Sequence, residues 1–170
     1  MTDDLEILIY GDRGLREISA PVEEFDARLR SLVDGMVRAM AAERGIGLAA
    51  PQVGVLRRVL IARPGGSHGP RVEVLVNPEI HFQSEERDGF DEGCLSLPGI
   101  TAEVQRPVRI RVRYQDLDGA EHELEDDDLL ARIIQHEYDH LEGVLFVDHL
   151  GVLRRKLIAK KLKALARRAG

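Results

Sequence analysis

The hydrophobic residues near the start of the chain recur at helical spacing. Between residues 24 and 43 this stripe contains Phe25, Leu29, Leu32, Val33, Met36, Val37 and Met40. Such spacing places one apolar face on a helix, and Gly45 follows as a stop signal. We therefore predict an amphipathic scaffold helix over about 24–43.

The middle of the chain has the pattern of strands. Residues 55–62 and 72–77 are short apolar or β-branched runs that a glycine- and proline-rich segment separates. At 108–114, VRIRVRY alternates apolar residues with arginines, which is typical of a strand with one solvated face. Asp118-Gly119 predicts a tight turn into a second alternating segment at 120–125.

Another helix is predicted after the acidic run from Glu125 to Asp128, because acids suit the positive end of a helix dipole. Gly143 ends it, and Glu137 falls in line with its apolar face, which contains Leu129, Leu130, Ile133, Ile134 and Leu141. A buried, unpaired carboxylate is costly or takes up a proton. We therefore expect a cation or a hydrogen-bonding group beside Glu137.

The same helix contains two histidines one turn apart. The stretch QHEYDHLEG at 135–143 holds His136, Glu137 and His140 in the HExxH pattern. Helical spacing sets both imidazoles on one face, which suits a zinc-like metal ion. HExxH alone is weak evidence, because five residues recur by chance and two nitrogens leave an ion short of ligands. A third ligand has to come from elsewhere in the chain.

The only cysteine, Cys94, lies in EGCLSLPG at 92–99. A thiolate added to His136 and His140 gives three protein ligands and one open position, the arrangement of catalytic metal sites. A lone cysteine is also often a small buried apolar residue. It cannot form an internal disulfide, so an oxidising compartment is not implied.

The segment GIGLAAPQVG at 45–54 combines two glycines with Gln52. The glycines allow the backbone to approach a ligand closely, and Gln52 offers an amide donor at the end of an apolar run. The same residues also fit a tight turn with a capping glutamine. Neither the GxGxxG spacing nor a Lys-Ser/Thr ending is present, so the segment is no phosphate-binding loop.

The composition is that of a globular protein with an aliphatic core: 44% of residues are hydrophobic and only 4% are aromatic. A length of 170 residues predicts a single domain over 1–170. The acidic start MTDDLEIL does not resemble a targeting signal, and no apolar run has the length of a membrane span. We expect a cytoplasmic protein that binds neither DNA nor a membrane.

Residues 151–170 carry a charge opposite to that of the rest of the chain. They contain eight Lys/Arg and no acid, so the first 150 residues have a formal net charge of −14 against −6 for the whole chain. The apolar positions fall near helical spacing: Val152, Leu153, Leu157, Ile158, Leu162, Leu165 and Ala166. This basic amphipathic C-terminal helix either docks with a solvated face or contacts an anionic partner, such as ribosomal RNA or a membrane surface.

Together and in this order, GIGLAAPQVG, EGCLSLPG and QHEYDHLEG strongly resemble the three signature motifs of bacterial peptide deformylases. The similarity extends over about residues 5–150. Two small departures are Gly11, where a proline is common in the family, and His149, where a basic residue is frequent. Pattern and resemblance predict an α+β fold, with small antiparallel sheets packed around a central HExxH helix and a helix near each terminus.

The resemblance implies an enzyme that removes the N-formyl group from the initiator methionine of nascent peptides and releases formate. It implies one divalent metal ion, expected to be Fe²⁺, bound by Cys94, His136 and His140. Ligand spacing does not distinguish iron from zinc, nickel or cobalt. Glu137 would be the general acid and base, and the oxyanion would be held by Gln52 and the backbone N–H of Leu95.

The substrate site can be partly reasoned from the chemistry of methionine, and the partner follows from the same resemblance. Ile46, Leu130 and Ile133 are proposed walls of a slot for the methionine side chain, although ordinary core positions explain them equally. Backbone groups at Ile46 and Gly47 would pair with an extended peptide as an added strand. Family members with a C-terminal helix suggest that residues 151–170 contact the ribosome near the peptide exit.

Two other functions stay open from the sequence. One is a small HExxH peptidase that cleaves internal amides, which usually needs a third ligand downstream; the only later histidine is His149, and the acids Glu142 and Asp148 lie close behind. The other is a binding protein that keeps the metal without turnover. The context of Cys94 and the presence of every expected chemical residue argue against both.

Overall fold

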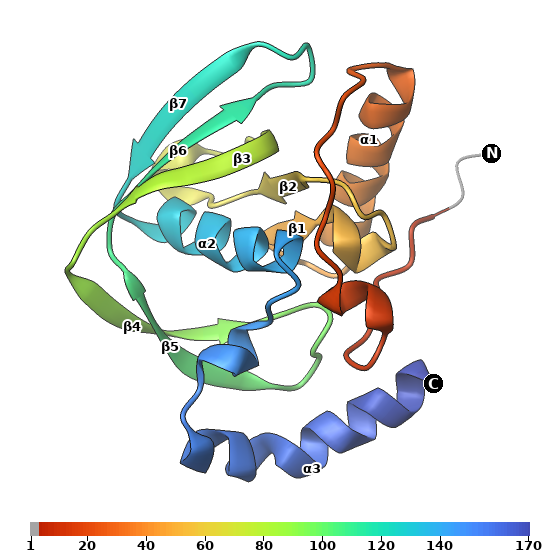
Figure 1. Ribbon diagram of the computed structural model, residues 1–170, viewed down its shortest axis with the longest axis vertical. Coiled ribbons are helices and arrows are strands. Elements are labelled where there is room, and N and C mark those ends of the chain that lie inside the picture. The colour runs from red at the N-terminus through yellow and green to blue at the C-terminus, as the bar shows by residue number, and fades with distance from the viewer. Residues whose placement is uncertain (1–3) are drawn as a thin grey trace.

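Two antiparallel sheets enclose the second helix of the computed structural model, which describes residues 4–170 (Figure 1). The larger sheet has the strand order β1-β2-β3-β6-β7. Its strands are β1 Gly47–Ala49, β2 Val59–Ala62, β3 Glu73–Gln83, β6 Ile110–Gln115 and β7 Glu121–Asp126. The smaller sheet is a hairpin of β4 Arg87–Gly93 and β5 Thr101–Pro107. These sheets confirm the predicted α+β class.

Helix α2, Leu129–Leu141, lies between the large sheet and the hairpin. Its Leu130 and Ile134 are buried in one cluster with sheet residues that include Leu60, Leu75 and Val112. Burying such aliphatic side chains stabilises the fold by about 1.5–3 kcal/mol each. The helix begins after the acidic run as predicted, and Asp126 accepts a hydrogen bond from the otherwise unpaired N–H of Ala131 at 2.9 Å.

Helix α1, Ala27–Ala42, is shorter than the predicted range of 24–43. Its start is set by Asp26, whose carboxylate accepts hydrogen bonds from the N–H groups of Arg28 and Leu29 at 3.0 and 3.1 Å. The predicted apolar stripe faces inward and buries Leu29, Val33, Met36 and Met40.

Two strand predictions need new boundaries, and one hairpin is absent from the prediction. The first strand begins only at Val59, and the second continues to Gln83 because β3 pairs with β2 first and with β6 afterwards. The β4–β5 hairpin was missed. Along β4 only Glu92 is buried, so this strand has no hydrophobic alternation for a sequence pattern to detect.

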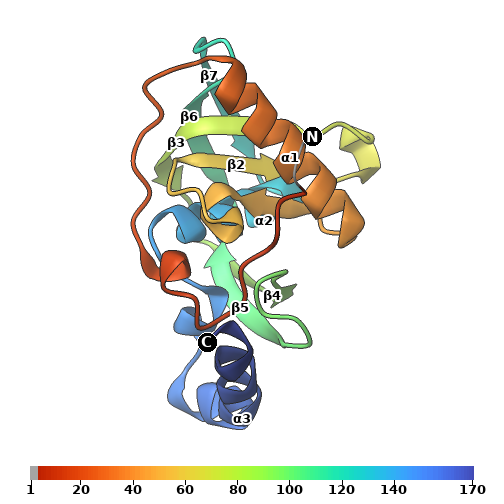
Figure 2. The same ribbon diagram turned by 90° about the vertical axis from the view of Figure 1, so that its right-hand side faces the viewer.

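Helix α3, Val152–Ala169, forms where the C-terminal helix was predicted and lies beyond the hairpin, away from the large sheet (Figure 2). Only part of its apolar stripe packs against the rest of the protein. Leu162 and Leu165 are buried, whereas three side chains of its first turns are 73–77% exposed: Val152, Leu153 and Leu157. No helix within residues 4–170 is both long enough and apolar enough to span a membrane.

Candidate active site

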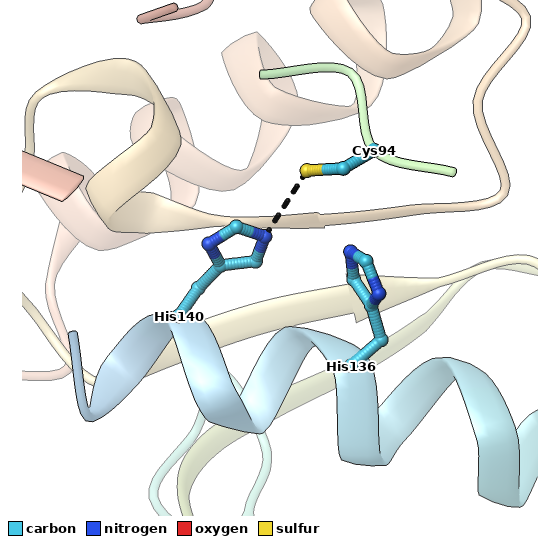
Figure 3. Close-up of side chains that lie close together, drawn as sticks. All are labelled: Cys94, His136 and His140. Carbon is cyan, nitrogen blue, oxygen red and sulfur yellow. Dashed lines mark hydrogen bonds between the residues drawn. The ribbon is translucent and has the colours of Figure 1, made fainter. Parts of the chain in front are cut away.

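Three potential metal ligands from two elements meet beside α2. Cys94 directly follows the end of β4. His136 and His140 project from the same face of α2 towards the sulfur of Cys94 (Figure 3). The Cys94 sulfur lies 3.4 Å from Nε2 of His140, and one ligand atom of each residue lies within 4.8 Å of the other two. Segments more than forty residues apart thus form one compact donor set.

Glu92 determines which nitrogen of His136 faces this cluster. Its Oε1 lies 2.7 Å from Nδ1 of His136, which leaves Nε2 for the cluster. Arg106 pairs with both carboxylate oxygens of Glu92, at 2.7 and 3.0 Å, and Arg132 reaches Oε2 at 3.1 Å. Burial raises the pKa of Glu92, but the hydrogen bonds from His136 and Arg106 outweigh it and lower this pKa to about 2. Glu92 is therefore a carboxylate throughout the neutral range.

The two histidines of the cluster have opposite proton affinities. Burial lowers the pKa of His136, but the hydrogen bonds with Cys94 and Glu92 outweigh burial and raise it well above its ordinary value. Burial and the charge of His136 lower the pKa of His140 well below its ordinary value. His136 therefore binds a proton more readily than His140 does.

The cluster fits a divalent transition metal on its own chemistry. One thiolate and two imidazoles are the ligand types that such ions prefer, and three protein ligands leave a position open. Among the described residues, Nδ1 of His140 and Oε2 of Glu137 are buried without a hydrogen-bond partner. Unpaired buried polar atoms are rare, and a site for an ion and its water accounts for the one on Glu137.

Glu137 lies on α2 next to the cluster and is 4% exposed, as its place on the apolar face predicts. Burial raises the pKa of its carboxyl to about 7, against a smaller opposing effect of His136. A carboxyl with a pKa near the ambient pH exchanges protons readily in both directions. Because Oε2 of Glu137 has no hydrogen-bond partner among the described residues, the expected cation or donor beside it stays a prediction.

The amide of Gln52 is held in one orientation by its neighbours. Gln52 lies in a short 3-10 turn, Ala50–Val53, that follows β1. Its Oε1 accepts a hydrogen bond from the N–H of Ala49 at 2.9 Å, so its Nε2 faces Ser96 Oγ at 3.1 Å and Cys94 Sγ at 3.5 Å. The N–H donors of the side chain are therefore directed at the cluster.

A cavity of about 440 Å³ opens beside these groups. Leu95 and three of the four residues proposed for substrate binding lie on its wall, namely Ile46, Gly47 and Ile133. Leu130 does not; it is 5% exposed in the core below the large sheet, and Leu129 lines the cavity in its place. Phe90, which the sequence did not single out, is 48% exposed on the same wall.

The edge of the large sheet borders this cavity. Within the described chain, β1 is the last strand of its sheet and pairs only with β2. The carbonyl of Ile46 already accepts a hydrogen bond from the N–H of Arg63 at 2.7 Å. The other edge of β1, beside Gly47, faces no further strand.

The fold and the donor set together define a class of protein. A Cys, His, His cluster on an HExxH helix, with a buried carboxyl and an oriented amide beside a cavity, is the type of site that metal-dependent hydrolases use. The sequence model of the polypeptide deformylase family matches residues 4–156. The chain belongs to this family, whose members are hydrolases.

Individual relatives agree along almost the full chain. A peptide deformylase of Bartonella tribocorum is 46% identical over 156 residues, covering 90% of this chain and 88% of its own. One of Chromohalobacter salexigens is 49% identical over 160 residues, covering 94% and 93%.

Solved structures show the same fold. A plant peptide deformylase superposes with a TM-score of 0.92 at 43% identity, over 96% of this chain and 89% of that one. The peptide deformylase of Thermotoga maritima gives a TM-score of 0.82 at 39% identity, over 86% and 97%.

Proposed function

We propose that this protein removes the formyl group from N-formylmethionine at the start of nascent polypeptides and releases formate. The observation that carries the proposal is the convergence of Cys94, His136 and His140 beside the buried carboxyl of Glu137 and the oriented amide of Gln52. These residues supply every role that amide hydrolysis needs, and they adjoin one cavity.

Cys94, His136 and His140 hold one divalent ion, expected to be Fe²⁺; Zn²⁺, Ni²⁺ and Co²⁺ suit the same ligands. When bound, the ion would supply Lewis acidity and lower the pKa of a water molecule, so that the nucleophilic hydroxide forms near neutral pH. Glu92 keeps His136 in the tautomer that presents Nε2.

Glu137 moves the proton. Its carboxylate accepts a proton from the attacking water and then donates it to the departing nitrogen as the bond between carbon and nitrogen breaks. A pKa near 7 suits both halves of this cycle, because the group is neither too weak a base nor too weak an acid.

Gln52 and the backbone N–H of Leu95 stabilise the negative charge that develops on the formyl oxygen. The Gln52 amide needs little reorganisation, since Ala49 and Ser96 already fix it. Donors that are oriented before the reaction are the most effective ones.

The methionine side chain occupies the apolar part of the cavity, between Ile46, Leu129 and Ile133. Leu130 packs in the hydrophobic core and is therefore left out of this slot. The peptide backbone pairs with the outer edge of β1 at Gly47 as an added strand. Because main-chain hydrogen bonds supply the affinity, binding depends on few side chains of the peptide. Such binding accepts many sequences after the methionine, as an enzyme for most new chains requires.

The test is formate release from formyl-Met-Ala-Ser compared with cleavage of blocked internal peptides. Formate release with intact internal peptides supports the proposal, and cleavage confined to the blocked peptides indicates an internal peptidase. Bound metal without formate release above the metal-free control indicates a binding protein. Cys94→Ser and Cys94→Ala are expected to lose most metal and activity, and full metal occupancy in either would contradict the ligand assignment.

We also infer that α3 contacts the ribosome in the cytoplasm. Its eight basic residues without an acid support an anionic partner. Because Leu162 and Leu165 are buried, deletion of 151–170 would uncover core, so the sharper variant replaces exposed Lys156, Lys160 and Lys163 by glutamine. We expect this variant to sediment less with ribosomes, most clearly at low salt, and to hydrolyse short peptides normally; unchanged sedimentation would contradict the inference.

A further inference from the structure

Arg132 is a buried cation that joins α2 to the hairpin. It lies one turn before His136 and is 8% exposed. Its Nη1 donates to Oε2 of Glu92 at 3.1 Å and to the carbonyl of Val104 at 3.0 Å. Its Nη2 donates to the carbonyl of Asp88 at 3.1 Å and to the Asp88 carboxylate at 2.5 Å.

All four acceptors belong to the β4–β5 hairpin: Asp88 and Glu92 to β4, and Val104 to β5. The sulfur of Cys94 comes directly after β4, whereas both imidazoles project from α2. The distance between sulfur and nitrogen ligands therefore depends on how the hairpin docks against the helix. Arg132 makes a planar, forked set of hydrogen bonds across this junction, which a lysine ammonium cannot reproduce.

The negative charge of Glu92 does not by itself explain why a second arginine, Arg132, is buried beside it. Arg106 already pairs with both oxygens of that carboxylate. A second buried guanidinium costs desolvation energy unless it is fully paired. Three of the four hydrogen bonds of Arg132 go to Val104 and Asp88, away from Glu92, so its contacts mainly hold the two strands of the hairpin.

Arg132 also lies on the wall of the cavity. Its guanidinium carbon is 5.7 Å from the ring centre of Phe90, and both residues line the cavity. A cation over an aromatic face is attractive, so the position of Phe90 at the cavity wall depends on Arg132 as well.

We propose that Arg132 is a positioning residue that sets the placement of the Cys94 sulfur relative to the two imidazoles and keeps Phe90 at the cavity wall. This inference deepens the proposed function and rests on it for its kinetic part. Its metal part is independent, because a Cys, His, His cluster binds a metal ion whether or not formyl peptides are the substrate.

The experiment uses protein loaded with Co²⁺, in which thiolate coordination has a charge-transfer absorption band. Arg132→Met removes the fork, and Arg132→Lys keeps the charge without it. Asp88→Asn weakens one of these hydrogen bonds, and because the Asp88 side chain is 63% exposed we expect the variant to fold. The matched control is Arg87→Met, an exposed arginine of the same strand whose guanidinium donates to the carbonyl of Gln105 within the hairpin.

We expect Arg132→Met to lose Co²⁺ to excess chelator about 10–100-fold faster than the wild type, with a weaker or shifted thiolate band. Arg132→Lys should lie closer to Arg132→Met than to the wild type, and Asp88→Asn should release Co²⁺ a few-fold faster. Arg87→Met should match the wild type. On formyl-Met-Ala-Ser, kcat of Arg132→Met should fall more than KM rises, because the ligands are displaced more than the binding slot.

Wild-type Co²⁺ release and an unaltered thiolate band in Arg132→Met would overturn the inference, even if its melting temperature falls, because that combination indicates a purely structural role. If Arg132→Met does not fold, wild-type release and band in both Arg132→Lys and Asp88→Asn would overturn it equally. Absence of formate release by the wild type is a different failure: it refutes the proposed function and leaves the Co²⁺ measurement interpretable.

Discussion

Gly47 and Glu137 approach each other so closely that only a glycine fits. A Cβ atom at Gly47 would lie 2.6 Å from Oε1 of Glu137 and 2.7 Å from Cγ2 of Ile133. Strand β1 is thereby brought against the carboxyl that is proposed to move the proton. A side chain at Gly47 would therefore displace the carboxyl of Glu137 or the side chain of Ile133.

Gly47→Ala is therefore expected to displace Glu137 and to lower kcat/KM for formyl-Met-Ala-Ser by about 100-fold, because a shift of about 1 Å at a reacting group costs that much. Bound metal should stay near the wild-type level, since the ligands are not touched. Gly151→Ala, where no atom lies within 4 Å of the added Cβ, is the control. Wild-type kcat/KM in Gly47→Ala would show that the contact does not matter.

The oxyanion donor can be weakened in two steps. Gln52→Ala removes the amide and should cost about 3–4 kcal/mol of transition-state stabilisation, read as kcat. Ser96→Ala removes only the acceptor that holds Nε2 of Gln52 at 3.1 Å, and it should cost about 1 kcal/mol. The order of the two effects is the informative result: equal losses would mean that Ser96 acts on the fold or on Cys94 and not through Gln52.

Removal of the metal ion should destabilise the protein as well as inactivate it. Within the described chain, Oε2 of Glu137 is buried without a hydrogen-bond partner, and an ion with its water would give it one. Re-addition of Zn²⁺ at about 100 times its Kd should restore about 2.7 kcal/mol, measured as a concentration-dependent rise of the melting temperature. Cys94→Ser should show little of this rise; a rise as large as that of the wild type would exclude the sulfur from the ligand set.

A pH-dependent link ties the N-terminal segment to the chain after α2. Arg16 pairs with both oxygens of Asp148, at 2.5 and 3.2 Å, and the N–H of Leu145 donates to the same carboxylate at 2.9 Å. Burial raises the pKa of Asp148, but these hydrogen bonds outweigh it and hold the pKa below its ordinary value of 3.8. The unfolded chain therefore binds a proton first as the pH falls, so the stabilisation is present above pH 3.8 and is lost below it.

Asp148→Asn should lower the free energy of unfolding by about 1 kcal/mol at pH 7, and the difference from the wild type should shrink as the pH falls below about 4. Urea titrations at pH 7, 5 and 3.5 would measure it. Asp118→Asn is the control, since Asp118 pairs with Arg30 at a site where its side chain is 78% exposed. A constant difference between pH 7 and 3.5 would rule out the ionised carboxylate as the cause.

The helices and the donor set could be predicted because they depend on local spacing and on chemically distinctive residues. The HExxH spacing fixes the relation of His136 and His140 within one helix. The residues of the cavity wall depend on finer geometry. Leu129 and Leu130 lie about 100° apart around α2, and both fall within its broad apolar face. The sequence pattern therefore does not show which of the two lines the cavity. Arg132 was hidden for a different reason, because an arginine in an apolar arc is recognisable as buried only once its acceptors on a distant hairpin are known.

The end of the C-terminal helix lies close to a glycine in the N-terminal segment. Gly11 has φ +107°, and a Cβ atom there would lie 2.7 Å from the Cα of Ala166 in α3. Gly11→Ala should therefore loosen the end of α3 and lower stability by about 1–3 kcal/mol, part of it from backbone strain. Gly65→Ala separates the two causes, because Gly65 also has positive φ, +67°, but no atom within 4 Å of an added Cβ.

Hydrogen exchange along α3 should accelerate in Gly11→Ala and not in Gly65→Ala. Hydrolysis of short formyl peptides should stay within about twofold of the wild type, because no residue of α3 lines the cavity beside Cys94. Equal exchange rates in the two variants would mean that Leu162 and Leu165 hold α3 without the close approach at Gly11. Faster exchange in Gly11→Ala alone would identify this glycine as the contact that fixes the basic helix in place.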